Sequence, residues 1–233
     1  MEHTGVAAED AEMLCNEEPE SKAGAKAKRK PPTIFGYDIR YFFVGMIVFA
    51  FFGFCAENIG RMAVQHIFDC RHQILPFLFA YGIALLAVYV FMGTPDELRF
   101  FNIRIFKEKT PLKRVLSHVI YFAVIFVFIL GGEIAVGTIY EEFAGVILWD
   151  YSNIPKHITR YTSIITTLLY GGGVYLLMAF AFKPMMRLIM KMGTKAATIV
   201  DCTLGIAIVL DFIATIVIMF VTGSAPEYWS VAW

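Results

Sequence analysis

Four acidic residues lie in the segment 131–155, directly after one of the most apolar runs of the sequence. Glu133, Gly137 and Glu141 are spaced four residues apart, so on a helix they fall within about 80° on one face. Clustered carboxylates can bind a divalent cation or act as acid and base. The same residues can instead be solvated side chains where a helix leaves a membrane. Both interpretations stay open for Glu133 and Glu141, whereas Glu142 fits the solvated one better.

A second polar group precedes this segment. Glu57 and Arg61 are four residues apart and can form an ion pair on one helix face. The pair is either a local salt bridge or part of a larger site. In the larger site Glu57 and Glu133 converge, and Arg61 or Arg71 balances their charge.

Asp211 lies near the middle of the last apolar run, and no basic residue is close to it in that run. An acid inside a membrane faces the interior of the helix bundle and is by default a candidate functional residue. The alternative is a hydrogen bond to a Ser, Thr or Tyr side chain on a neighbouring helix.

The composition places these acids in an integral membrane protein. Of the 233 residues, 58% are hydrophobic and 17% are charged, and the mean hydropathy is +0.63. Soluble domains are typically about 45–50% apolar and about 25% charged. A bilayer core requires about 20 apolar residues in a helix. We therefore predict an all-α membrane protein with five transmembrane helices, near residues 41–57, 74–92, 115–132, 162–182 and 199–222.

The basic residues predict the orientation. Alternate connecting segments carry sixteen Lys and Arg residues on one side and four on the other. The positive-inside rule puts the sixteen in the cytoplasm. We expect a multi-pass plasma-membrane protein with a disordered cytoplasmic tail over 1–32, a transmembrane domain over 33–222, and a short outer tail over 223–233. Beyond Glu133 we expect an amphipathic stretch on the outer face, and the cytoplasmic segment 100–106 is expected to be interfacial, not a strand.

A weak internal similarity relates two parts of the chain. Around the first two predicted helices the sequence reads AENIG, then an aspartate, then AYG. Around the third and fourth it reads GEIAVG, then an aspartate, then LYGGG. Two duplicated helix pairs followed by a fifth helix would explain the pattern, as duplication does in transporter folds. Chance similarity between apolar segments explains it equally well.

Motifs of soluble active sites are missing from the sequence. It has no Walker A motif, no G-x-S-x-G, no H-E-x-x-H and no glycine-rich dinucleotide loop. Its Cys and His residues do not have metal-ligand spacing. We predict no catalytic residue, no metal site, no cofactor in this chain and no nucleic-acid partner.

The segment from Glu133 resembles the signature of the bacterial integral membrane proteins called the Putative ABC-transporter type IV family, or CmpB-like permeases. The matching residues, with every spacing kept, are Glu133, Gly137, Glu141, Gly145, Trp149, Asp150, Tyr151, Ser152 and Pro155. Tyr170-Gly171 stands where the family has Trp-Gly. An earlier family motif is matched by Glu57, Arg71, Pro76 and Tyr81-Gly82. The chain departs from the family at Cys70-Arg71-His72, His157 and Arg160, and it has one residue fewer between Arg71 and Pro76.

The resemblance implies a permease subunit that moves a small molecule. Any ATP would then be used by a separate ATPase subunit, which would dock on the cytoplasmic segments 100–114 or 183–195. Glu57, Glu133, Glu141 and Asp150 would line an outer vestibule, with Asp211 along the path. The bilayer is the other expected partner, and a homo-oligomer is compatible with the sequence. The alternatives are a structural or signalling membrane subunit and a membrane-embedded enzyme acting on lipid-linked substrates.

Overall fold

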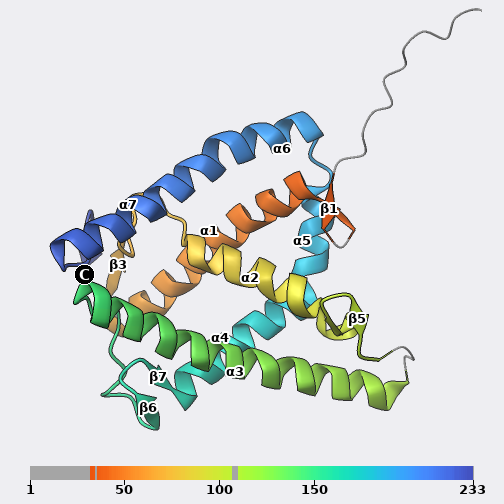
Figure 1. Ribbon diagram of the computed structural model, residues 1–233, viewed down its shortest axis with the longest axis horizontal. Coiled ribbons are helices and arrows are strands. Elements are labelled where there is room, and N and C mark those ends of the chain that lie inside the picture. The colour runs from red at the N-terminus through yellow and green to blue at the C-terminus, as the bar shows by residue number, and fades with distance from the viewer. Residues whose placement is uncertain (1–31, 35, 107–109, 233) are drawn as a thin grey trace, which may run out of the picture. The chain divides into compact units, whose positions relative to one another are not determined.

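Five long apolar helices make up most of the computed structural model, which describes residues 32–34, 36–106 and 110–232 (Figure 1). The predicted tail therefore lies outside the described residues, except for Pro32. The candidate membrane spans in the described chain are Ile39–Ala63, Phe79–Glu97, Pro111–Ala144, Ile164–Ile189 and Thr194–Thr222. The prediction of a helical membrane protein with five spans is thus confirmed.

The first three spans are built on single helices, α1 (Ile39–Gln65), α2 (Phe79–Met92) and α3 (Pro111–Ala144). The fourth consists of α4 (Ile164–Leu176), a π-helical turn (Leu177–Ala181) and α5 (Phe182–Ile189). The fifth consists of α6 (Thr194–Val200), a second π-helical turn (Asp201–Gly205) and α7 (Ile206–Thr222). Each of the last two spans therefore has one widened turn, a feature that is frequent at functional sites.

Local sequence signals fix the ends of these helices. The side chains of Asp38, Thr110 and Ser163 accept hydrogen bonds from the first backbone N–H groups of α1, α3 and α4. Gly145 and Gly223 have φ angles of 67° and 64° and end α3 and α7, because glycine adopts this left-handed conformation without a steric penalty.

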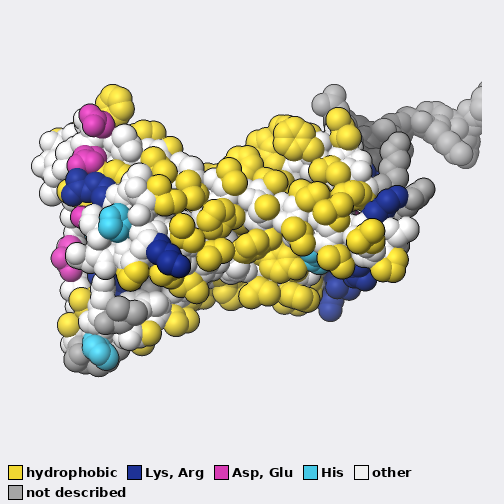
Figure 2. Space-filling view, turned by 90° about the horizontal axis from the view of Figure 1, so that it is seen from below, with side chains coloured by type: hydrophobic (Ala, Val, Ile, Leu, Met, Phe, Trp, Pro, Cys, Tyr) yellow, Lys and Arg dark blue, Asp and Glu magenta, His cyan; other side chains and the backbone are white. Residues whose placement is uncertain are grey.

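The two ends of the bundle differ in their charged side chains. At the end that we call the acidic end, α1, α3 and α7 finish and α4 begins (Figure 1). At the opposite end, which we call the basic end, α1, α3 and α6 begin and α5 finishes. Figure 2 shows apolar side chains over the middle of one face, with charged side chains gathered towards the two ends. This distribution matches a lipid-facing belt between two polar regions.

Short antiparallel strand pairs close the connections. The pairs are β1 (Thr33–Ile34) with β2 (Tyr37–Asp38), β4 (Arg99–Phe100) with β5 (Ile103–Arg104), β6 (His157–Thr159) with β7 (Thr162–Ser163), and β3 (Ile67–Asp69) with β8 (Ser230–Ala232). The β4–β5 pair corrects the expectation that residues 100–106 form no strand. The turn brings these residues together because Phe101 adopts a left-handed φ of 52° and its N–H donates to the Phe91 carbonyl.

The core lies around α1, which packs on α2, α5, α6 and the second π-helical turn. Phe49 of α1 and Phe182 of α5 are fully buried, and their rings stack with centroids 5.6 Å apart. The ring of Tyr89 in α2 also stacks on Phe182, with centroids 4.4 Å apart. Gly82 permits the close approach of α2 to α1, since a Cβ atom there would collide with the Met46 carbonyl oxygen. The core therefore rests on stacked aromatic rings and one close helix contact.

All five helices depart from the predicted ranges at one end or both, and two of these differences concern the acidic end. The second helix begins at Phe79 instead of residue 74, because residues 70–78 form a loop whose backbone is bound by α7. The third helix runs on through the expected amphipathic stretch to Ala144. It has 34 residues, which at about 1.5 Å per residue makes about 51 Å, more than the roughly 30 Å of a bilayer core.

Candidate functional site

Glu57 is the meeting point of four elements near the acidic end. The Tyr81 hydroxyl of α2 donates a short hydrogen bond to Glu57 Oε1, and the Tyr170 hydroxyl of α4 lies 3.3 Å from the same oxygen. Arg71, from the loop before α2, places Nη2 3.3 Å from Glu57 Oε2. The carboxylate of α1 is thus bonded on both oxygens, and its charge is balanced by Arg71.

Arg61 does not pair with Glu57, which corrects the predicted ion pair. Its guanidinium lies 2.9 Å from Asp69 Oδ2 instead. The buried Asn58 holds Asp69, because Asn58 Oδ1 accepts the Asp69 N–H at 2.9 Å. Asp69 Oδ1 in turn accepts the Arg71 N–H at 3.0 Å. The strand β3 therefore supplies the partner for Arg61 and leaves Arg71 for Glu57. The sequence indicated an aspartate here only through the internal similarity, and nothing in it indicated Asn58.

Glu133 is bound by threonine hydroxyls. Thr162 Oγ1 donates to Glu133 Oε2 at 2.5 Å, and Thr167 Oγ1 lies 3.4 Å from the same oxygen. Both threonines are fully buried, and their hydroxyls are 3.0 Å apart. Neither was predicted, because a threonine near the start of a helix usually serves as a cap and carries no other signal.

Tyr151 interacts with both carboxylates. Its backbone N–H donates to the Arg160 carbonyl at 2.7 Å, which turns the connecting segment back onto α4. Its side chain interacts with Tyr170 and, electrostatically, with Glu133 and Glu57. Burial raises the pKa of Tyr151 to about 12, and the Glu133 carboxylate acts in the same direction. Glu57 and Glu133 therefore share one polar site, which we call the tyrosine site: Glu57, Arg71, Tyr81, Glu133, Tyr151, Thr162, Thr167 and Tyr170.

This site is sunk below the helix ends. Glu57 lies eight residues before the end of α1, and Glu133 lies eleven before the end of α3. At about 1.5 Å per residue these positions are about 12 Å and 16 Å along the helix axes. Both carboxylates thus lie within candidate membrane spans, where an ionised side chain is costly unless it is paired.

Glu141 belongs to a separate group nearer the helix end. The Tyr161 hydroxyl donates a short hydrogen bond to Glu141, and Arg160 Nη1 lies 2.6 Å from Glu141 Oε1. Arg160 also reaches Asp150 Oδ2 at 3.5 Å. Trp149 fixes the backbone here, since its indole N–H donates to the Tyr161 carbonyl at 2.8 Å. Glu133 and Glu141 share a helix but contact different partners.

The remaining motif residues between Gly145 and Pro155 form turns. Gly145 ends α3 by donating its N–H to the carbonyls of the last helical turn. Asp150 Oδ1 accepts the Ser152 N–H at 2.8 Å, and hydrogen bonding to the side chain and then the backbone of Ser152 lowers the pKa of the Asp150 carboxyl. Pro155 lies in the following turn. These side chains shape the connection that carries Tyr151 into the tyrosine site.

One arrangement of three residues occurs twice in the structure. Gly53 of α1 leaves room for the Tyr81 ring, since a Cβ atom there would lie 2.6 Å from it, and Tyr81 donates to Glu57. Gly137 of α3 likewise leaves room for the Tyr161 ring, and Tyr161 donates to Glu141. Each glycine precedes its glutamate by four residues. In this structural repeat Glu57 corresponds to Glu141, whereas the internal sequence similarity aligned Glu57 with Glu133. Gly171 shows no such contact, as a Cβ atom there would meet its neighbours at 3.8 Å.

Asp211 holds the loop 70–78. Its two carboxylate oxygens accept the N–H groups of Ile74 at 3.1 Å and Leu75 at 2.9 Å. One turn further along α7, the Thr215 hydroxyl donates to the His72 carbonyl at 3.0 Å. Arg71 in this loop has a left-handed φ of 51°, a conformation that surrounding contacts must maintain. Asp211 thus acts on the tyrosine site indirectly, by holding the loop that carries Arg71.

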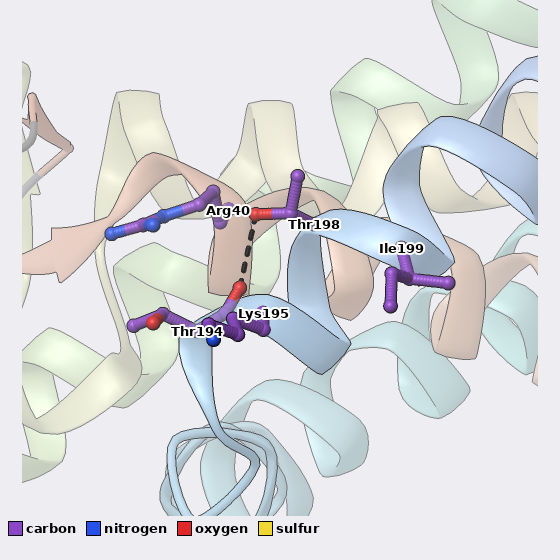
Figure 3. Close-up of a pocket in the computed structure, with 5 residues that line it drawn as sticks. All are labelled: Arg40, Thr194, Lys195, Thr198 and Ile199. Carbon is purple, nitrogen blue, oxygen red and sulfur yellow. Dashed lines mark hydrogen bonds between the residues drawn. The ribbon is translucent and has the colours of Figure 1, made fainter.

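The basic end has a shallow pocket of about 360 Å³ (Figure 3). Arg40 of α1 and four residues of the fifth span line it, Thr194, Lys195, Thr198 and Ile199, and the Thr198 hydroxyl donates to the Thr194 carbonyl at 2.9 Å. The sequence singled out none of these as site residues. Across the described ranges, no three His, Cys, Asp or Glu side chains are grouped to hold a metal ion.

Comparison with known proteins yields one family. The family model described as Putative ABC-transporter type IV matches residues 42–216, which include all seven predicted polar-site residues, from Glu57 to Asp211. No curated protein and no solved structure matches the chain. The match covers most of the chain, from the start of α1 into α7. The chain therefore belongs to the Putative ABC-transporter type IV family.

Proposed function

We propose that this chain is the membrane-spanning subunit of a transporter and that the tyrosine site handles the transported small molecule. The carrying observation is the convergence of α1, α2, α3 and α4 on polar side chains placed below the helix ends. Polar and ionisable groups inside a membrane mark substrate and ion pathways. Family membership supports the same function.

In this proposal the acidic end faces outward and the basic end faces the cytoplasm, in the plasma membrane. A separate ATPase subunit docks on the basic end, at the segments 100–114 and 183–195. Lys195 lines the shallow pocket at this end, Lys191 lies in the turn between α5 and α6, and both side chains are exposed. Cross-links between these lysines and a co-purified ATPase subunit would support the docking, and a transporter active without ATP would contradict it.

A structural role fits the neighbouring group better than a transport role. Glu141 is bonded by Tyr161 and Arg160, and Asp150 by Ser152 and Arg160. All of these contacts hold the connection between α3 and α4. We therefore assign ligand handling to Glu57 and Glu133, and shaping of the connection to Glu141 and Asp150.

The test compares metabolites inside and outside cells that express the parental chain or a variant at equal membrane levels. Glu57→Gln and Glu133→Gln are expected to abolish the redistribution of the transported compound. Glu142→Gln is the matched control, because Glu142 lies on the same helix as Glu133 and its side chain is exposed. Parental redistribution in both site variants would refute the proposal. A non-transporting subunit would instead show no redistribution with any chain.

A further inference from the structure

Glu133, unlike three other carboxylates at the acidic end, has no cationic partner among the described residues. Glu57 is paired with Arg71, Asp69 with Arg61, and Glu141 with Arg160. Within the described ranges no Lys or Arg nitrogen lies within 4.0 Å of Glu133. The charged side chain with which it interacts there is another carboxylate, Glu57.

The hydroxyl contacts of Glu133 leave part of the group available. Thr162 and Thr167 both bind Oε2, and no hydrogen bond is found for Oε1 from any described residue. Oε1 is also not among the buried polar atoms that lack a partner in the described chain. This oxygen is therefore not fully enclosed by protein atoms, and it lies inside a candidate span next to a second carboxylate.

The charge of the tyrosine site follows from these pairs. Glu57 and Arg71 cancel, so Glu133 leaves the site with one uncompensated negative charge. An ionised side chain inside a membrane span is costly unless it is paired. A cationic ligand would offset this cost, whereas an anionic ligand would add to the repulsion from Glu57.

The surroundings select among cations. Among the described residues no three His, Cys, Asp or Glu side chains are grouped as a metal site, which favours an organic cation over a divalent ion. They do offer hydroxyl groups and the aromatic side chains of Tyr151 and Tyr170, and aromatic rings attract organic cations. An ammonium group has N–H donors for Glu133 Oε1 and a charge for the aromatic rings.

We propose that Glu133 binds the ammonium group of a small organic amine in the tyrosine site. This inference rests on the proposed function, because it names the class of molecule that the site handles. It assigns Glu133 the charge recognition, and Tyr151 and Tyr170 the contact with the carbon atoms next to the nitrogen.

The first experiment uses the full-length parental protein in lipid nanodiscs and needs no transport assay. A hydrophobic carbodiimide activates carboxyl groups, and a primary amine converts part of the activated carboxyl to an amide. Peptide mass spectrometry therefore measures labelling at each position as the sum of N-acylurea and propylamide products. Propylammonium chloride is expected to reduce labelling of Glu133 several-fold and to leave Glu142 unchanged. Propanol, sodium propionate and sodium chloride at the same concentration are expected to have no effect. Equal protection by sodium chloride would overturn the inference, as would absence of protection by propylammonium.

A second measurement follows the thermal unfolding midpoint, since a ligand that binds only the folded state raises it. Propylammonium is expected to raise the midpoint of the parental protein and of Glu142→Gln, but not that of Glu133→Gln. An equal rise in Glu133→Gln would overturn the inference. The two proposals fail separately. Protection by propylammonium without any cellular redistribution would support the amine site and refute the transport function. Glu133-dependent transport of a compound that is not an amine would support the transport function and refute the amine site.

Discussion

Replacement of Asp211 tests whether this acid holds the loop 70–78. Asp211→Asn keeps one acceptor oxygen and turns an amide N–H₂ towards a backbone N–H, so one of the two hydrogen bonds is lost. A hydrogen bond to a charged group contributes about 1.5–3 kcal/mol. The loop-open state should therefore become about tenfold to 150-fold more populated. Asp211→Ala removes both acceptors and should increase it further.

Cys70 provides the readout. Its side chain is 1% exposed, and its Sγ atom accepts the Tyr228 N–H at 3.4 Å, so alkylation requires the loop to open. We expect the alkylation rate of Cys70 in detergent to rise by the factor given above. Cys202 is exposed and should react at the same rate in every variant, which makes it an internal reference.

The matched control is Thr203→Val. Thr203 lies in the same span as Asp211, but its hydroxyl donates to the Ile199 carbonyl of its own helix. Cys70 should react at the parental rate in this variant. A parental rate in Asp211→Ala as well would refute the role of Asp211 as an anchor of the loop, and would return it to the transport path as a separate site.

Two further predictions concern the connection between α3 and α4. Gly137→Ala would place a Cβ atom against the Tyr161 ring and should lower the free energy of unfolding by about 1–3 kcal/mol. Gly131→Ala on the same helix meets open space and should be neutral or slightly stabilising in thermal melts. Equal unfolding midpoints for the two variants would contradict the packing of Tyr161 on Gly137. Tyr151 should titrate near pH 12, because its folded-state pKa of about 12 exceeds the ordinary 10.0. Its stabilising contribution is then present below pH 10 and lost as the pH rises to 12. The difference in phenolate absorbance between the parent and Tyr151→Phe measures this, and a difference centred at pH 10 would contradict it.

The sequence predicted the helices well because a long apolar run in a membrane has only one way to satisfy its backbone. It also brought Glu57, Arg71, Tyr81 and Tyr170 into consideration, and these side chains do meet. The partners of Arg61 could not be predicted, because Asp69 reaches it through a strand whose pairing residue, Ser230, lies far along the chain. Periodicity and spacing report only contacts within one element.

The same limit applies to Asp211 and Glu133. The partners of Asp211 are backbone N–H groups of a loop, which every residue except proline possesses and which therefore leave no trace in the sequence. The buried threonines beside Glu133 are 29 and 34 residues away from it. Contacts of this kind follow from the packing of α3 against the start of α4, which no local pattern encodes.

The pairing of β3 with β8 has a consequence for biosynthesis. Tyr228 and Cys70, which this pairing brings together, are 158 residues apart in the chain. At about 5–20 residues per second, a ribosome needs roughly 8–30 s to make the intervening chain. During that time the loop between α1 and α2 lacks its final partners. The loop that carries Arg71 therefore gains the contacts that hold it only after the fifth span has been made, so it is among the last parts of the protein to be completed.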